Sequence, residues 1–246
     1  MVLLQKRWVL IGAVTLALLL SACGGPQIEV ASLPVTDDPS GQFASLTNAV
    51  LDGRQQQLNV LSPDWYAKAG ASLEKARKGM SLGDSAVEVL ENLAYGQAYL
   101  EKARDYARVA KTVIGPAIDA RNAANKVNAM EFAKEYQTIE DDFLSLTRSI
   151  EDGEVARAKK GSLKVALAYS DLELRAIKKS ALGEVRTRLS QAEKNRAGKI
   201  APVTLGGAKK ILAEADEFIT EHRYGREQIL RKASAALFQT KRLEQV

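Results

Sequence analysis

The stretch that decides the fold is FAKEYQTIEDDFLSLTRSI, which runs from Phe132 to Ile150. Its apolar side chains recur every three or four residues, so they lie on one face of an α-helix. This first stripe consists of Phe132, Tyr136, Ile139, Phe143, Leu146 and Ile150. A second stripe with the same spacing follows Asp152-Gly153 and consists of Ala158, Ser162, Val165, Tyr169, Leu172 and Ala176. Because glycine readily takes the positive φ that ends a helix, we predict two antiparallel helices that bury their stripes against each other.

The same apolar spacing is also compatible with a coiled coil between two chains. The turn at Asp152-Gly153 is short, however, and a short turn favours a hairpin within one chain. We therefore predict a coiled-coil-like bundle of antiparallel hairpins, and the oligomeric state stays open.

Helical patterns extend from Gln42 to the end of the sequence. Alanine, leucine, lysine, arginine, glutamate and glutamine dominate there, and all of them favour helices. Ser62 is expected to cap a helix that begins at Pro63. We expect a turn around Gly83 and a break at Gly115-Pro116, because proline removes a backbone donor. The sequence therefore predicts an elongated, all-α fold.

The beginning of the helical part matches its end when the sequence is shifted by 139 residues. Pro63 then falls on Pro202, and Leu61 falls on Ile200. The segment 128–178 looks like a looser copy that lacks the proline. Because repeated helix pairs cannot bury their apolar stripes alone, neighbouring units are expected to stack. We therefore predict an internal duplication.

Charge argues against a nucleic-acid partner. The chain has 35 Lys and Arg against 30 Asp and Glu, and without residues 1–22 these numbers become 33 and 30. The surplus is small and both signs are interspersed, whereas nucleic-acid binding requires clustered basic residues. We expect a solvated surface and no nucleic-acid partner.

Few residues of this sequence suit catalysis. The single histidine, His222, lies in a predicted turn between helices, and the single cysteine is Cys23. The acidic run Glu140-Asp141-Asp142 flanks apolar stripe positions and is interpreted as a solvated helix face. Metal-binding Cys/His spacings and phosphate-binding glycine loops are missing. We therefore predict no enzyme activity, no catalytic residue, no metal site and no cofactor. The aromatic pair Trp65-Tyr66 is interpreted as core or rim packing in preference to a ligand-stacking site.

The N-terminus has the order of a secretory signal. Lys6 and Arg7 precede an apolar run from Trp8 to Leu20, and small residues follow. The run gives about 20 Å of helix, which is short for a bilayer core of roughly 30 Å. We therefore predict a cleaved signal peptide at 1–22 in preference to a transmembrane anchor.

The residues Leu20, Ser21, Ala22 and Cys23, followed by Gly24, resemble the bacterial lipobox. The resemblance implies that the chain is cut before Cys23 and that Cys23 is acylated, so that a lipid holds the protein to a membrane. Gly24 in place of aspartate after the cysteine resembles the sorting signal of outer-membrane lipoproteins in enteric-type bacteria. The resemblance implies a location in the outer membrane, facing the periplasm. Residues 23–41 are rich in proline and glycine and are interpreted as a lipid-anchored flexible tether.

We divide the rest into a helical repeat unit at 42–127, a middle helical hairpin at 128–178 and a second repeat unit at 179–246. The repeat around Pro63 and Pro202 resembles the helical periplasmic region of Gram-negative lipoproteins, which often precedes an OmpA-like peptidoglycan-binding domain. No segment similar to that domain follows the helices up to Val246. The resemblance implies an envelope protein or a peptidoglycan-associated structure as the partner.

Together these patterns favour a non-enzymatic, lipid-anchored envelope lipoprotein that acts as a periplasmic spacer or adaptor. An alternative is a helical binding module for a small or apolar ligand in the periplasm.

Overall fold

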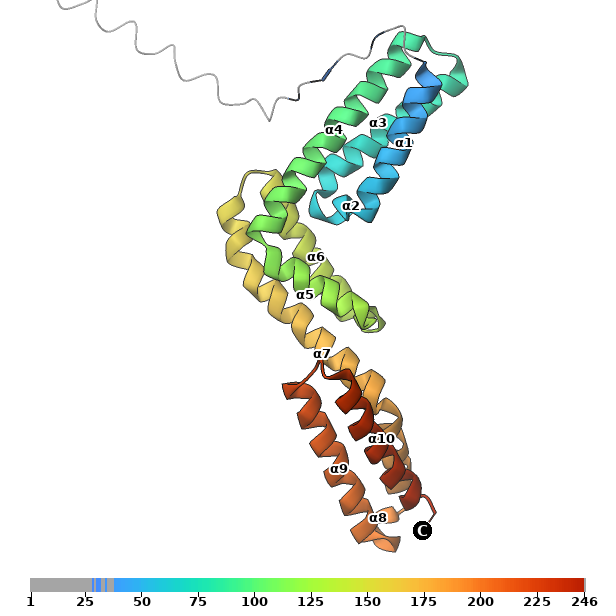
Figure 1. The fold of residues 1–246 in the computed structure, drawn as a ribbon, viewed down its shortest axis with the longest axis vertical. Helices are drawn as coiled ribbons and strands as arrows, with labels where there is room; N and C mark the ends of the chain where they lie inside the picture. Colours follow the sequence, from blue (N-terminus) through green and yellow to red (C-terminus); the bar gives the residue numbers. More distant parts are fainter. Residues whose placement is uncertain (1–27, 29, 32–33, 35–37, 246) are drawn as a thin grey trace, which may run out of the picture.

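A computed structural model describes residue 28, residues 30–31, residue 34 and residues 38–245. The predicted signal peptide and the lipobox residues Leu20 to Gly24 lie outside these residues. The described part consists of α-helices and one 3₁₀ helix and contains no strand, which confirms the all-α prediction. The helices form an elongated rod that bends near its middle (Figure 1).

The N-terminal bundle comprises α1 (Pro39–Gln55), α2 (Leu58–Leu61), α3 (Pro63–Leu82) and α4 (Ala86–Val113). The carboxylate of Asp38 accepts hydrogen bonds from the first free amides of α1, so this helix begins inside the predicted tether. Ser85 and Glu88 form a capping box at the start of α4. Gly83 has the positive φ of 77° that ends α3, as predicted. Helices α3 and α4 pack along each other, and α1 covers both.

The middle bundle comprises α5 (Gly115–Lys126), the 3₁₀ helix η1 (Ala129–Glu131), α6 (Ala133–Glu151) and the first part of α7 (Val155–Lys194). Pro116 interrupts the helical run between α4 and α5, as predicted. Helix α6 ends before Gly153, whose φ is 81°, and packs against α7. The predicted antiparallel hairpin is therefore confirmed.

The C-terminal bundle comprises the second part of α7, α8 (Ala197–Ile200), α9 (Pro202–Glu221) and α10 (Arg226–Leu243). Its three long helices pack pairwise. Helix α7 continues without a break across residues 178 and 179, where the sequence analysis divides the chain. Its 40 residues correspond to about 60 Å, and they connect the middle and C-terminal bundles through one helix (Figure 1).

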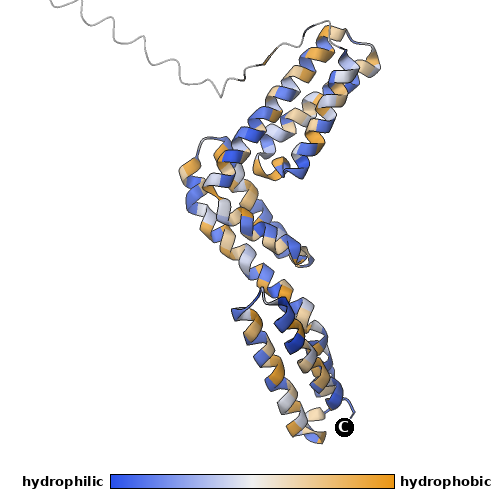
Figure 2. Cartoon of the chain, in the orientation of Figure 1, coloured by the Kyte–Doolittle hydropathy of each residue, from blue (hydrophilic) through white to orange (hydrophobic). Residues whose placement is uncertain are grey.

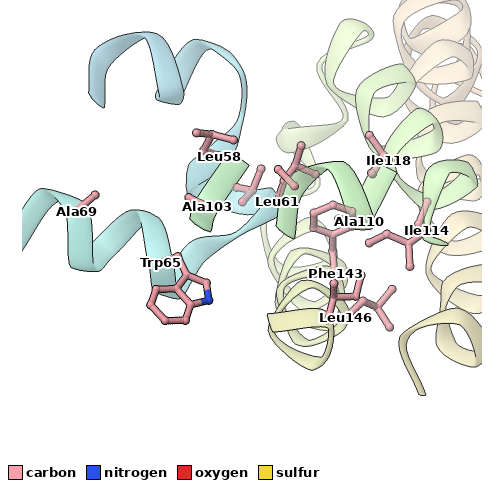
Figure 3. Packing of buried hydrophobic residues seen from close by; sticks show 14 of the residues in the cluster. Leu58, Leu61, Trp65, Ala69, Ala103, Ala110, Ile114, Ile118, Phe143 and Leu146 are labelled. Carbon is pink, nitrogen blue, oxygen red and sulfur yellow. The ribbon is translucent and has the colours of Figure 1, made fainter. Parts of the chain in front are cut away.

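One continuous core joins the N-terminal and middle bundles, whereas the C-terminal bundle has two smaller clusters of its own. Figure 2 shows hydrophilic and hydrophobic residues alternating along the helices, as amphipathic packing requires. Leu61 and Ala110 of the N-terminal bundle belong to the same cluster as Phe143 of the middle bundle (Figure 3). Ala69 and Ala208 are almost completely buried at matching places, so the helix axes approach closely there.

The same order of elements occurs at three places. A residue in the left-handed conformation is followed by a short helix, a long helix and a second long helix. The left-handed residues are Gln57 (φ 63°), Asn128 (φ 57°) and Arg196 (φ 66°). The bounds of α2 and α3 recur 139 residues later as those of α8 and α9. An internal duplication as the origin of this order stays a prediction.

Candidate functional site

The junction between the N-terminal and middle bundles is built around Glu151, the last residue of α6. Its carboxylate accepts hydrogen bonds from the Ser62 hydroxyl at 2.6 Å and from the backbone amides of Asp64 and Trp65 at 3.2 and 3.1 Å. The prediction that Ser62 caps α3 is wrong, because its side chain makes no capping hydrogen bond. Instead, Glu151 caps α3 from the neighbouring bundle.

Glu151 is only 7% exposed, and no ion pair to it exists among the described residues. Burial raises the pKa of Glu151 above its usual value, although the hydrogen bonds from Ser62 and from the backbone of Trp65 and Asp64 act in the opposite direction. The charge that Glu151 carries when ionised is therefore stabilised by the start of α3 and not by a basic side chain.

A second buried polar contact, within the middle bundle, is an ion pair between Arg121 of α5 and Glu140 of α6. Arg121 Nη2 lies 2.6 Å from Glu140 Oε1, and the two side chains are 12% and 13% exposed. Tyr169 donates a hydrogen bond to the same carboxylate at 2.6 Å. Arg121 also donates to Gln57 Oε1 at 3.3 Å, which connects the pair to the turn between α1 and α2. The interpretation of Glu140 as part of a solvated face is therefore wrong, whereas Asp141 is exposed.

These contacts fix the protonation states of the buried groups. Burial raises the pKa of Glu140, but the hydrogen bonds from Arg121 and Tyr169 outweigh burial and hold this pKa below its usual value. Burial and the neighbouring Glu140 raise the pKa of Tyr169. At neutral pH the network is thus a carboxylate with two donors, Arg121 and Tyr169, which is a structural arrangement and not a catalytic pair poised to exchange a proton.

A cleft of about 690 Å³ opens beside this junction. Its aromatic lining is formed by Trp65, Tyr99 and Tyr106, and Lys68 and Glu151 are among its polar residues. Trp65 stacks on Tyr106 with a centroid separation of 6.1 Å and an interplanar angle of 4°. The Lys68 ammonium lies 3.9 Å from the Trp65 ring centroid.

The two residues of the predicted aromatic pair have different surroundings. Trp65 is 6% exposed and belongs to the core, which confirms the interpretation of core or rim packing. The Tyr66 hydroxyl donates to the carbonyl of Val50 at 2.9 Å. Tyr99 and Tyr106 complete the aromatic lining of the cleft. They lie on α4, and because they are far from Trp65 in the sequence, the sequence alone did not connect them with it.

A second junction connects the middle part of α7 to the turn between α9 and α10. Arg223 donates to the carbonyl oxygen of Ser170 at 3.0 Å and to Glu173 Oε2 at 3.3 Å. Tyr224 donates to the same carboxylate oxygen at 3.3 Å. Glu173 is only 3% exposed. Sequence reasoning missed this contact; the position of Glu173 between the stripe residues Leu172 and Ala176 is the signal that could have indicated it.

The structure does not bring the remaining candidate residues together. His222 is half-exposed in the turn after α9, directly before the junction residue Arg223, and its ring stacks on that of Phe218 with the ring centroids 4.5 Å apart. Within the described part of the chain, no group of three or more metal-ligating side chains occurs. No helix among the described residues is long and apolar enough to cross a membrane.

Comparisons of this chain with protein-family models, with curated proteins and with solved structures give no match. We therefore infer the function from the geometry of the rod, its junctions and its cleft.

Proposed function

We propose that this protein is a non-enzymatic, lipid-anchored envelope lipoprotein that acts as a spacer or adaptor in the periplasm. The observation that carries the proposal is the way in which the three bundles are joined. Buried polar contacts at Glu151 and Glu173, together with the shared helix α7, hold the bundles in one rod. The lipobox residues around Cys23 supply the attachment, and the outer membrane is the proposed location.

A spacer needs a constant distance between its ends. A flexible linker between bundles would give a broad range of distances. Here the link between the middle and C-terminal bundles is a continuous helix, and the link between the first two bundles shares a hydrophobic core. The sides of the rod then present exposed helix faces to an envelope protein or a peptidoglycan-associated partner.

Metabolic labelling with palmitate tests the attachment. The wild-type protein is expected to incorporate the label and to fractionate with the outer membrane. The Cys23→Ser variant is expected to lose the label and to leave that fraction. A Cys23→Ser protein that fractionates like the wild type would overturn the lipid anchor.

Pairs of spin labels test the rigidity. The chain from Gly24 on has no other cysteine, so exposed lysines can be replaced by cysteine in pairs. Lys75→Cys with Lys160→Cys reports on the first junction, and Lys160→Cys with Lys210→Cys reports on the second. Each pair is expected to give one narrow distance distribution. A broad distribution for either pair would contradict the spacer function without affecting the lipid anchor.

The aromatic cleft favours a second candidate function, the binding of a small ligand with flat apolar faces such as a sugar ring. Tyr99 and Tyr106 offer stacking surfaces, and Asp64 offers a hydrogen-bond acceptor. Trp65 is the only tryptophan from Gly24 on, so its fluorescence reports on this cleft directly. Titration with soluble peptidoglycan fragments is expected to change this emission, and Tyr106→Leu is expected to weaken the change at least tenfold. An unchanged spectrum at millimolar fragment would exclude this candidate.

A further inference from the structure

The far end of the rod exposes two large apolar side chains. Ile200, at the end of α8, is 65% exposed, and Val203, in the first turn of α9, is 86% exposed. Figure 1 places α8 and the C-terminus together at this end. We refer to the turn from Lys194 to Val203 as the distal tip.

The matching position in the N-terminal bundle is covered. Leu61 stands 139 residues before Ile200, at the end of α2, and is 1% exposed. Helix α6 of the middle bundle packs against α2 and α3 there. Among the described residues, α8 packs chiefly on α7 and α9 of its own bundle, and Ile200 and Val203 are exposed.

Charge is distributed unevenly along the rod. Residues 178–246 contain 15 Lys and Arg against 8 Asp and Glu, a net charge of +7, whereas residues 39–177 contain 18 against 19. At the distal tip Lys194, Arg196 and Lys199 are exposed. No ion pair involves these three side chains within the described part of the chain. The basic surplus, which looks small and interspersed over the chain as a whole, is therefore concentrated in residues 178–246.

We infer that the distal tip docks onto the surface of a phospholipid bilayer with anionic headgroups. Exposed apolar side chains next to basic side chains are a combination that binds such a surface. The apolar groups enter the membrane interface, and the basic groups pair with the anionic headgroups. The positive charge disfavours contact between two copies of the tip. A rod anchored by a lipid at Cys23 would then contact anionic lipid at its other end. This inference goes beyond the spacer function and does not require the lipid anchor.

The experiment uses the chain from Gly24 to Val246, which lacks the lipidated cysteine. All residues of the three hydrophobic cores lie between Ile28 and Leu243, so this chain contains every packing contact described above. Co-sedimentation is measured with vesicles of phosphatidylcholine and with vesicles that also contain phosphatidylglycerol. We expect binding to the anionic vesicles alone, weakened about tenfold or more when salt is raised from about 50 to 500 mM.

Two variants of the tip separate the apolar from the basic contribution. Ile200→Ser with Val203→Ser is expected to weaken vesicle binding at least about fivefold. The triple variant Lys194→Gln, Arg196→Gln and Lys199→Gln is expected to weaken it at least about tenfold. Because all five positions are exposed, circular dichroism is expected to show unchanged folding.

Matched controls exist at the opposite end of the rod. Leu82 and Val87 are 69% and 53% exposed, and Asp84 and Glu88 accompany them in place of basic residues. Leu82→Ser with Val87→Ser is expected to leave vesicle binding unchanged within about twofold. Binding of all variants like the wild type, equal binding to neutral vesicles, or no binding to anionic vesicles would each overturn the inference. The palmitate experiment is unaffected by any of these results.

Discussion

Glu151 accepts a 2.6 Å hydrogen bond from Ser62 across 89 residues of sequence. The same carboxylate also accepts hydrogen bonds from two backbone amides at the start of α3. One side chain therefore caps a helix of the N-terminal bundle while it belongs to a helix of the middle bundle. Glu151 thus couples the start of α3 to the packing of the two bundles, in addition to the hydrophobic core that they share.

Glu151→Ala is expected to lower the free energy of unfolding by about 2–3 kcal/mol, because it leaves the buried donors of Ser62 and Trp65 and the part-buried amide of Asp64 without their acceptor. Urea denaturation followed by circular dichroism measures this change. Glu154→Ala is the matched control, since Glu154 is an exposed acid only three residues away, and it is expected to cost less than about 0.5 kcal/mol. Equal effects of the two substitutions would contradict the capping role of Glu151.

Replacement of Glu140 is expected to change how stability depends on pH. The pKa of Glu140 is held below its usual value of 4.5 in the folded protein. Its contribution is therefore fully present above about pH 4.5 and is lost as the pH falls through the lower folded-state pKa. Glu140→Gln is expected to lower the free energy of unfolding by about 3 kcal/mol at pH 7, since it leaves Arg121 buried and unpaired. The variant is also expected to lose less stability than the wild type as the pH falls below about 4.5.

Thermal unfolding between pH 3 and 7 checks this prediction. Asp141→Asn, at the exposed neighbouring position, is expected to retain the wild-type profile. A Glu140→Gln variant with the full acid-dependent loss of stability would show that the Arg121–Glu140 pair is not its source.

Two helical glycines are expected to respond in opposite directions to alanine. A Cβ at Gly70 meets nothing within 4 Å, so Gly70→Ala is expected to stabilise the protein by about 0.5–1 kcal/mol through helix propensity. A Cβ at Gly96 would lie 2.6 Å from Leu46 Cδ2, and Leu46 is fully buried. Gly96→Ala is therefore expected to destabilise by about 1–3 kcal/mol. Urea denaturation measures both, and stabilisation by Gly96→Ala would contradict the close packing of α4 against α1.

Arg223→Ala is expected to loosen the C-terminal bundle alone. The substitution removes the cation beside Glu173, a carboxylate that is 3% exposed. It is expected to lower the free energy of unfolding by about 2 kcal/mol, which is less than for a fully buried pair because Arg223 is partly solvated. Hydrogen exchange is expected to rise in the turn between α9 and α10 and to stay unchanged in the N-terminal bundle. Arg226→Ala, at an exposed position in the next helix, serves as the control. A uniform rise in exchange along the whole chain would contradict a local junction.

The fold could be predicted from sequence to the extent that it depends on local signals. The apolar stripes on both sides of Asp152-Gly153 predicted α6 and α7, and Gly115-Pro116 predicted the break after α4. These signals act within a few residues, so the local sequence is sufficient to predict where these helices begin and end. The continuity of α7 across residues 178 and 179 was not predicted, because the chain was divided there according to its internal repeat. Neither proline nor glycine interrupts the helix at these two positions.

The junctions could not be predicted, because they depend on which helix ends meet in space. Ser62 has the sequence signature of a cap, yet its hydroxyl donates to Glu151. Glu140 stands in an acidic run, and only the approach of Arg121 from α5 distinguishes it from Asp141. The aromatic cleft was seen only in part, since Trp65 was identified but its partners on α4 were not.

The shared helix α7 has a mechanical consequence. A load applied along the molecule would pass from the middle to the C-terminal bundle through the backbone hydrogen bonds of one helix, with no loop in between to stretch first. The distance between these two bundles would therefore increase only when one of them loses its packing. This part of the protein would resist stretching up to a threshold force.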